Sequence, residues 1–269
     1  MRRLVTKLSG FAFARQLVRM LRLHELANWY LRHFPWVKRL PTGVIYRATR
    51  LESIPLAVEM FEKANLYDAS ILPANFTTFA DLGCNVGYFT CWLAHLANGR
   101  KLRGLMLDAN ADAVAEAQWH ANINQMPEVF AVYGVAGEGL QNDSAEFYLY
   151  ESNICSTSHR PDTGLTGEWK RMCVPCVSVD EHWRQHFGEL RCHVLKIDIE
   201  GSELSFLKTE QSFLRLVDSI MIEWHKWRTN LPEIKAFLGT HGFVLKNILE
   251  ENQAMGTAFF VAQTSGSKI

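Results

Sequence analysis

One short stretch, FADLGCNVGYFT at residues 79–90, constrains the fold of this chain more than any other. It has the pattern of a buried strand, a turn with two glycines and the start of a helix. Gly83 and Gly87 let the backbone turn sharply and let a ligand approach without a Cβ in the way. Strand-like and helical segments alternate from here onward, which is typical of a parallel sheet with crossover helices. We therefore expect a doubly wound α/β fold, with this turn at its ligand-binding crevice.

The alternation begins after Pro73 and Asn75, which punctuate the chain. We expect residues 75–269 to form the mostly parallel, Rossmann-like sheet domain, and residues 1–74 to form a basic helical extension with a short strand. The expected strands are 43–50, 77–81, 103–108, 129–135, 146–150, 172–177, 193–198, 219–224, 243–249 and 257–262, and the expected helices are 1–34, 55–65, 86–97, 111–124, 179–187, 202–216 and 231–240.

The first 34 residues combine apolar residues at helical spacing with an excess of positive charge. No Asp or Glu precedes Glu25, and Pro35 ends the helical pattern. Such a helix can pack on the following domain and leave its arginines in solvent. It can also lie on an anionic membrane surface, so peripheral membrane contact through residues 1–34 is a second expectation.

Composition narrows the class of protein. The chain is 48% hydrophobic and 21% charged, with a formal net charge of zero, so it lacks the basic footprint of a general nucleic-acid binder. Its apolar runs are shorter than the roughly 20 residues that span a bilayer. It has no secretory signal with a cleavage site, and its six cysteines form no small-scaffold disulfide pattern. We expect a cytoplasmic protein, peripheral to a membrane if the first helix binds lipid, with no nucleic-acid partner.

The spacing of the glycine turn separates two kinds of cofactor. A nicotinamide site would need G-x-G-x-x-G, whereas the chain has Gly83-x-Asn85-x-Gly87, and Tyr88 blocks the alternative frame. The pattern D-x-G-x-N-x-G, which starts at Asp81, resembles the first motif of class I S-adenosylmethionine-dependent methyltransferases. We expect Asp81, Gly83, Asn85, Gly87 and Tyr88 to contact this cofactor.

A second piece of the cofactor site follows the next strand, in RGLMLDANADAVAEAQWHANIN at residues 103–124. Asp108 ends that strand, where an acid can bind the two ribose hydroxyls of a nucleotide-like ligand. Asn110 is either a second cofactor contact or the N-cap of the following helix. Glu138, in the loop after the third strand, is a weaker candidate for contact with the adenine.

The stretch VLKIDIEGSE at residues 194–203 begins as a buried strand and becomes a run of charges. By the two-residue period of a strand, Lys196, Asp198 and Glu200 project toward one face. Buried charges are costly unless they are paired, solvated or used in chemistry. This strand is expected to end beside the crevice, so we expect the group to act there. An ion pair between Lys196 and a carboxylate is the structural alternative.

Three segments in order resemble one family. KIDIEGSELSFLK resembles the K-x-D-x-E-G-x-E signature of FkbM-type methyltransferases, CVPCVSVDEHW resembles the V-x-x-x-x-L-D segment that precedes it, and SIMIEWHKW resembles the strand that follows it. The resemblance covers about residues 75–263. The chain departs from the family at Asp108-Ala109, where Glu-Pro is usual, at Val179, where leucine is usual, and at Thr209, where glycine is common.

The resemblance implies an O-methyltransferase that uses S-adenosylmethionine and acts on a hydroxyl of a sugar, glycan or natural product. Such an enzyme must align the hydroxyl oxygen and take up its proton. Our candidates for these roles are Asp198, Glu200, Glu223 and His225, the last two on one face of the next strand. The carboxylates could instead hold Mg²⁺, but with Lys196 close by we expect no metal. His225 could also be a packed, hydrogen-bonded histidine.

Other features favour structural roles or leave alternatives open. Cys173 and Cys176 have redox spacing but lie on an expected strand, so we interpret them as structural thiols. The polar loop 152–169 either contacts the substrate or only connects two strands. Arg47 and Arg50 either face an anionic substrate or are solvated. A catalytically silent binding module is the alternative function, and a nicotinamide oxidoreductase is disfavoured by the glycine spacing.

Overall fold

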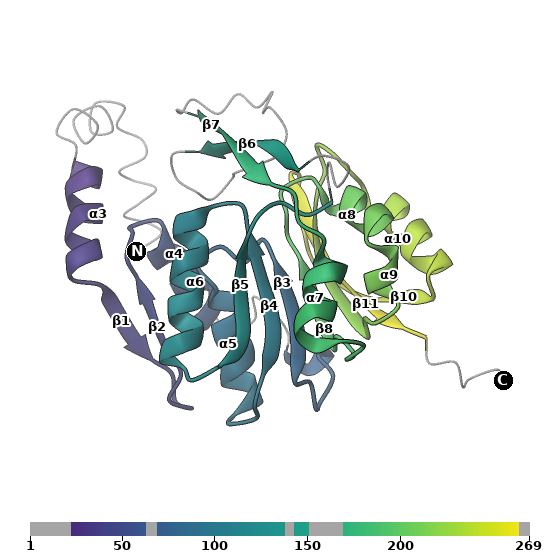
Figure 1. Ribbon diagram of the computed structural model, residues 1–269, viewed down its shortest axis with the longest axis horizontal. Helices are drawn as coiled ribbons and strands as arrows, with labels where there is room; N and C mark the ends of the chain where they lie inside the picture. Colours follow the sequence, from purple (N-terminus) through teal and green to yellow (C-terminus); the bar gives the residue numbers. More distant parts are fainter. Residues whose placement is uncertain (1–22, 63–68, 138–142, 151–168, 264–269) are drawn as a thin grey trace.

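A seven-stranded sheet forms the centre of the molecule (Figure 1). The structure, a computed structural model, describes residues 23–62, 69–137, 143–150 and 169–263. The sheet contains β3 (Thr78–Leu82), β4 (Arg103–Asp108), β5 (Glu128–Tyr133), β8 (Val194–Ile197), β9 (Ser219–His225), β10 (Phe243–Glu251) and β11 (Met255–Ala262). Their order is β10-β11-β9-β8-β3-β4-β5. The five strands from β9 to β5 are parallel, while β11 and β10 pair antiparallel.

Helices cover both faces of this sheet because its inner strands are apolar on both sides. In β4, Leu105 and Leu107 belong to one core cluster and Met106, between them, belongs to the other. The first cluster includes residues of α7 (Val179–Phe187), α8 (Glu203–Thr209), α9 (Gln211–Leu214) and α10 (Leu231–Thr240), and the second includes residues of α5 (Tyr88–Ala97) and α6 (Ala111–Ile123). The expected doubly wound, mostly parallel fold is confirmed.

The expected helix over 202–216 is wrong in one respect, because α8 ends before Glu210 and α9 starts after it. The buried Glu210 side chain accepts hydrogen bonds from the backbone N–H groups of Val179 (2.8 Å) and Asp180 (3.1 Å). Backbone N–H groups in the first turn of a helix have no hydrogen-bond partner within the helix. The Glu210 carboxylate supplies that partner for α7. The break in the helix therefore accompanies a tertiary contact.

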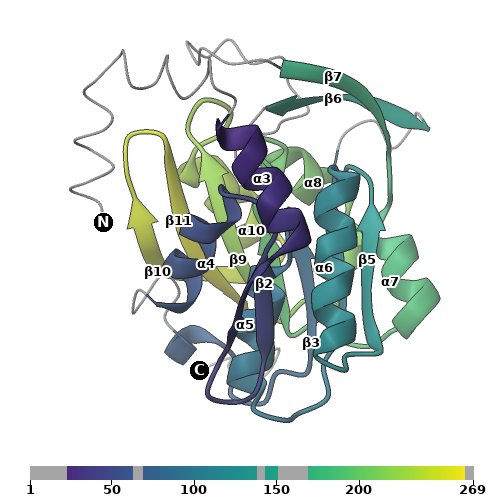
Figure 2. The ribbon, with the colours of Figure 1, turned by 90° about the vertical axis from the view of Figure 1, so that its left-hand side faces the viewer.

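Two expected strands lie outside the central sheet. β6 (Ser144–Tyr150) and β7 (Trp169–Pro175) pair only with each other, as an antiparallel hairpin. The hairpin lies at the end of the molecule where the parallel strands finish (Figures 1 and 2). An isolated bridge between Val135 and Cys176 connects its base to the segment after β5. The expected loop 152–169 and Glu138 fall outside the described residues, apart from the loop's last residue, where β7 begins.

The N-terminal extension contains more strand than expected. After α3 (Leu23–His33), the strands β1 (Trp36–Arg39) and β2 (Ile45–Ala48) form a hairpin, and α4 (Ser53–Phe61) and the 3-10 turn η1 (Ala69–Ile71) follow. Only β2 was expected as a strand. Tyr46 and Phe61 stack (4.1 Å between centroids) and both contact Tyr88 of α5 edge-on. The extension thus packs on the sheet domain, and the boundary at residues 74 and 75 stays a prediction. Residues 1–22 of the expected first helix lie outside the described part.

None of the described helices has the length and apolar composition needed to cross a bilayer.

Candidate active site

The glycine turn after β3 is wedged between the ends of two other strands. The N–H of Gly83 donates to the carbonyl of Leu107 at the end of β4 (2.9 Å). Gly83 has φ +72°, and a Cβ added to it would overlap the carbonyl oxygen of Asp198, just after β8. Gly87 has φ +83° and would meet the Cα of Ala117 in α6 at 3.1 Å. Both glycines are therefore needed for the conformation of the turn and for its close packing.

Asp81 and Lys196 occupy paired positions on the neighbouring strands β3 and β8. The Nζ of Lys196 lies 3.4 Å from Asp81 Oδ1 and 3.3 Å from Asp198 Oδ2, and it donates to the carbonyl of Gly83 at 3.1 Å. The hydroxyl of Thr90 donates to Asp81 at 3.2 Å. Burial raises the pKa of Asp81, while the charge of Lys196 lowers it. Asp81 is thus a buried, paired carboxylate beneath the turn, and its expected contact with the cofactor stays a prediction.

Asp108 ends β4 beside the same turn and remains partly exposed. Its two oxygens accept the backbone N–H groups of Asn85 and Asn110, each at 2.8 Å. Burial raises the pKa of Asp108 to about 6, although these two hydrogen bonds act in the opposite direction. The carboxylate therefore joins the turn after β3 to the turn after β4, where the expected cofactor residues meet.

The other expected cofactor residues differ in their surroundings. Asn85 and Asn110 line a small hollow, together with Arg50 and other residues before α4 and on α6. The side chain of Asn110 also caps α6 by accepting the N–H of Asp112 (3.1 Å). Its N-cap role is therefore confirmed, and its expected contact with the cofactor stays a prediction. Tyr88 is buried, and its hydroxyl donates to the carbonyl of Arg47 in β2 (2.8 Å).

The two arginines of the extension are paired with acids of α6. Arg47 forms two hydrogen bonds with Glu116 (2.6 and 2.9 Å) and lies over the ring of Trp119. Arg50 pairs with Asp112. These ion pairs connect the N-terminal extension to α6. Arg47 and Arg50 therefore have a structural role instead of being simply solvated.

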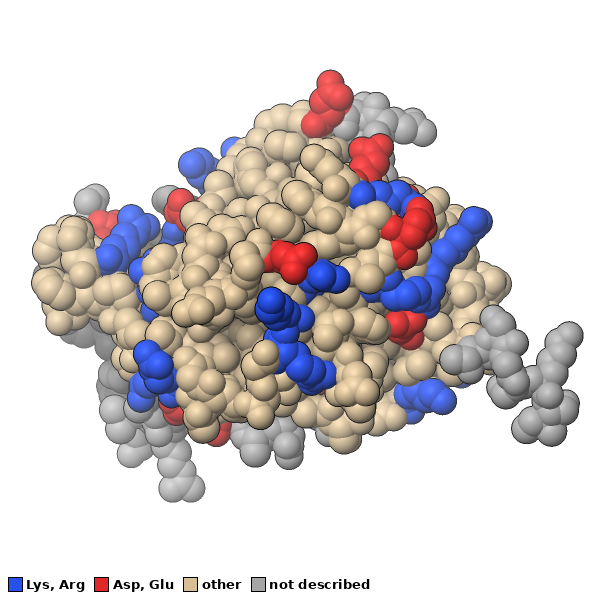
Figure 3. All heavy atoms as spheres, turned by 60° about the horizontal axis from the view of Figure 1, so that its bottom comes forward, with Lys and Arg blue, Asp and Glu red and all other residues tan. Residues whose placement is uncertain are grey.

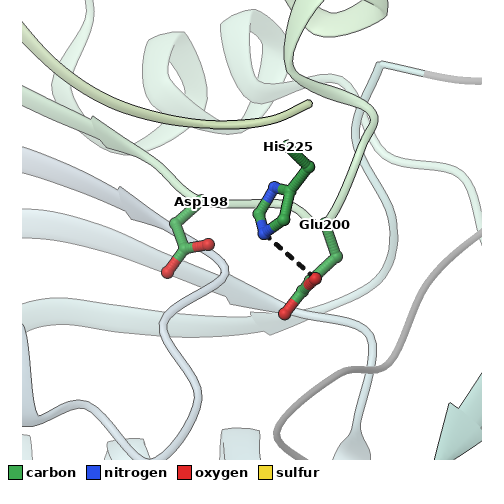
Figure 4. Close-up of side chains that lie close together, drawn as sticks. All are labelled: Asp198, Glu200 and His225. Carbon is green, nitrogen blue, oxygen red and sulfur yellow. Dashed lines mark ion pairs between the residues drawn. The ribbon is translucent and has the colours of Figure 1, made fainter. Parts of the chain in front are cut away.

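The run of charges after β8 does not keep the strand alternation that the sequence predicted. β8 ends at Ile197, and Glu200 adopts φ +50°, outside any strand. The turn nevertheless brings Glu200 to His225, with 3.1 Å between Oε2 and Nε2 (Figure 4). Glu223 reaches the same nitrogen at 3.7 Å from β9. Glu200, Glu223 and His225 therefore lie together, with Asp198 beside them.

Glu203 is the member of this cluster that sequence reasoning did not select. Its side chain is fully buried, and Oε1 lies 2.9 Å from Nδ1 of His225 and accepts the N–H of Gly201 (2.9 Å). A buried carboxylate on Nδ1 fixes the orientation of the ring and aims Nε2 at Glu200 and Glu223. The sequence signal that could have identified Glu203 is its position as the second acid of the E-G-x-E motif.

The carboxylates and the histidine change each other's proton affinity. Burial lowers the pKa of His225, but the hydrogen bond with Glu203 and the charges of Glu200, Glu203 and Asp198 outweigh it and raise the pKa to about 10. Burial raises the pKa of Glu200 and that of Glu223 to about 8. The charge of His225 lowers both pKa values but does not outweigh burial. Near neutral pH, His225 is therefore a cation, and Glu200 and Glu223 titrate together, holding protons to a higher pH than ordinary glutamates do.

The same cluster has ligand atoms close enough for a cation. One ligand atom each from Asp198, Glu200 and His225 lie within 4.8 Å of one another, in the part of the chain that the structure describes. Lys196 is already paired with Asp198, so a positive charge occupies one side of this group. The expectation that no metal is needed stays a prediction.

Glu200, Glu223 and His225 together are expected to stabilise the protein less as the pH rises from about 5 to about 10. The folded-state pKa values of Glu200, Glu223 and His225 all lie above their ordinary values, so the folded state holds these protons more tightly. The stabilisation from the glutamates is complete below about pH 4.5 and is lost through about pH 8; that from His225 is complete below about pH 6.5 and is lost through about pH 10.

Thermal unfolding of wild type and Glu223→Gln between pH 5 and pH 10, at constant ionic strength, checks this. The variant cannot titrate at residue 223, so its melting temperature should fall less steeply. Two parallel curves would contradict the raised pKa of Glu223.

The arrangement of the sheet and of these residues defines a class of fold. A mostly parallel sheet carries a glycine turn after β3, an acid at the end of the neighbouring β4, and ionisable residues at the ends of β8 and β9. This is a Rossmann-like fold, in which ligands usually bind at the carboxyl ends of the parallel strands.

The family follows from the sequence match. The family model described as "Methyltransferase FkbM domain" matches residues 81–245, well over half of the chain. This chain belongs to the FkbM methyltransferase family, and the cofactor of the family is S-adenosylmethionine. The family and cofactor expected from the sequence are confirmed.

Several solved structures are similar to this chain at low identity. The methyltransferase FkbM of Methylobacillus flagellatus KT is 14% identical, with 73% of this chain and 46% of that chain covered and a TM-score of 0.49. The M. capricolum TrmK complex with S-adenosyl-homocysteine is 11% identical (76% and 73% covered, TM-score 0.44), and Aeropyrum pernix fibrillarin with bound S-adenosyl-L-methionine is 11% identical (84% and 82%, TM-score 0.46). No curated protein matches the chain.

Proposed function

We propose that this protein transfers the methyl group of S-adenosylmethionine to a hydroxyl oxygen of a sugar, a glycan or a natural product. The observation that supports this most is the cluster of Glu200, Glu223 and His225 beside Asp198, whose backbone touches the glycine turn. When bound, the cofactor supplies an electrophilic methyl carbon on a sulfonium. An aliphatic hydroxyl is a poor acid, so a proton acceptor near the attacking oxygen contributes roughly 10²–10⁴-fold to the rate.

The residues at the glycine turn fit this cofactor. Asp108 is a partly exposed carboxylate at the end of β4, suited to ribose hydroxyls, and the amides of Asn85 and Asn110 face a hollow beside it. In this proposal Asp108, Asn85 and Asn110 hold the nucleoside part.

The residues of the acid cluster would have different roles, set by their protonation states. Glu200 and Glu223, with pKa values of about 8, are the acceptors closest to the working pH of a cell. Asp198 is held by Lys196 and would align the hydroxyl. His225, a cation held by Glu203, would orient Glu200 through Nε2.

The partner and the place of action are also proposals. A formal net charge of zero favours a small or glycan acceptor over a nucleic acid. The face at the amino ends of the parallel strands carries Lys and Arg together with Asp and Glu (Figure 3). We place the enzyme in the cytoplasm.

The first experiment is calorimetric titration with S-adenosylmethionine and S-adenosylhomocysteine. We expect micromolar binding to wild type and a loss of roughly 10–100-fold in Asp108→Ala, because a hydrogen bond to a charged group is removed. Glu181→Ala, an exposed acid on α7, is the matched control and should bind like wild type.

A screen of hydroxyl acceptors, read out as S-adenosylhomocysteine release, follows with Asp198→Asn as the impaired variant. Failure of the folded wild type to bind either ligand would refute the proposal and favour the catalytically silent binding module.

A further inference from the structure

Helix α3 stands at the edge of the molecule, beside the β1–β2 hairpin and away from the central sheet (Figures 1 and 2). Of its eleven residues only Leu31 is buried. Asn28 fixes its position: Oδ1 accepts the N–H of Leu51 (2.8 Å) and Nδ2 donates to Glu52 (3.4 Å). The helix is therefore anchored on one side, and the part of the chain that the structure describes leaves most of its surface uncovered.

The uncovered side is apolar and aromatic. Leu26, Trp29, Tyr30 and Phe34 are 60%, 54%, 55% and 61% exposed. Their spacing of three, four and eight residues puts them on one face of the helix and its end. The rings of Tyr30 and Phe34 lie 5.1 Å apart, so the face is continuous. We call these four residues the α3 face. A continuous exposed apolar face of this kind indicates an interaction site.

The sequence before and after the α3 face is mostly basic. Residues 1–22 contain six Lys and Arg residues and no acid, and Glu25 is the only acid before Glu52. Arg32 on α3 and Lys38 and Arg39 on β1, the strand that follows it, are exposed. Trp and Tyr beside basic residues are typical of segments at the interface between water and lipid, where cations attract anionic headgroups. A protein partner would need acids of its own, whereas an anionic bilayer provides both the negative surface and the apolar layer.

We propose that the α3 face docks this protein on an anionic lipid surface. Trp29 and Tyr30 lie at the headgroup boundary, Leu26 and Phe34 enter the acyl region, and the exposed Arg32, Lys38 and Arg39 contact the headgroups. The docking is separate from the proposed methyl transfer, because none of these residues belongs to the glycine turn or to the acid cluster.

Co-sedimentation of the full chain with vesicles tests this proposal. We expect binding to phosphatidylcholine vesicles with 30 mol% phosphatidylserine, and at least tenfold weaker binding to pure phosphatidylcholine or at high salt. Leu26→Ser/Phe34→Ser should weaken binding at least tenfold. Ile248→Ser on β10, 48% exposed, is the matched control and should bind like wild type.

Three results would overturn the proposal. The first is that wild type does not bind anionic vesicles, and the second is that the double variant binds them as well as wild type does. The third is that binding appears only after deletion of residues 1–22, which would mean that the chain covers its own α3 face. Light scattering tests whether a second copy of the chain covers the α3 face instead. If wild type is a dimer that does not bind vesicles, and the double variant is a monomer, the face is a dimer interface. Cofactor titration of the double variant, which should be unchanged, separates this outcome from a failure of the proposed function.

Discussion

Replacing Gly83 with alanine is expected to destabilise the protein by more than about 4 kcal/mol, or to prevent folding. The added Cβ would overlap the carbonyl oxygen of Asp198, which is backbone and cannot rotate away. The overlap could be removed only if β3 and β8 moved apart at the turn. Gly43 has a comparable φ of +92°, but a Cβ added there would have no atom within 4 Å. Gly43→Ala therefore isolates the cost of the backbone conformation alone, about 1–2 kcal/mol.

Urea denaturation of the two variants measures both effects. A large difference between them would show that the packing of the turn against β8, rather than its left-handed conformation, fixes the site. Equal losses would contradict this, because the backbone after β8 would then be able to move aside.

Replacing Lys196 with methionine is expected to cost about 3–5 kcal/mol, the usual penalty for leaving a buried charge without its partner. Asp81 is fully buried and Lys196 nearly so, and a methionine cannot replace the ammonium group between Asp81 and Asp198. The loss should be greater at pH 8 than at pH 5. Without Lys196 the pKa of Asp81 rises further above its unfolded value, so the stability that protonation contributes is lost as the pH rises.

Two controls make this prediction specific, again by urea denaturation. Lys226→Met breaks an exposed pair with Glu251 (2.7 Å) and should cost at most about 1 kcal/mol. The double variant Lys196→Met/Asp81→Asn removes both charges and should recover much of the loss. A double variant no more stable than Lys196→Met would mean that the ammonium group acts mainly through Gly83 and Asp198.

The sequence predicted the architecture well because the signals for it are local. Alternating strands and helices, and the spacing of Gly83 and Gly87, required no knowledge of distant contacts. The separate β6–β7 hairpin was not predictable in the same way, since strand propensity does not identify the pairing partner. The break at Glu210 was missed for a similar reason: its carboxylate serves the N-terminus of a helix more than 20 residues earlier.

The site was predicted in part. Period-two reasoning placed Glu223 and His225 together, because β9 is regular through both. It failed for Glu200, because β8 ends three residues before it and the chain turns with positive φ. The pairing of Asp81 with Lys196 depends on the register of two strands more than 100 residues apart. Glu203 was in the motif, but its contact with His225 depends on how α8 packs on β9.

The outermost strand of the sheet affects how the protein behaves at high concentration. β10 forms one edge, and its pairing with β11 shifts register twice, between Leu245 and Asn247 and between Ile248 and Glu250. Lys246, Glu250 and Glu251 are exposed along it. Irregular pairing and charged side chains disfavour the addition of a strand from another molecule. This edge is thus protected against aggregation by strand addition.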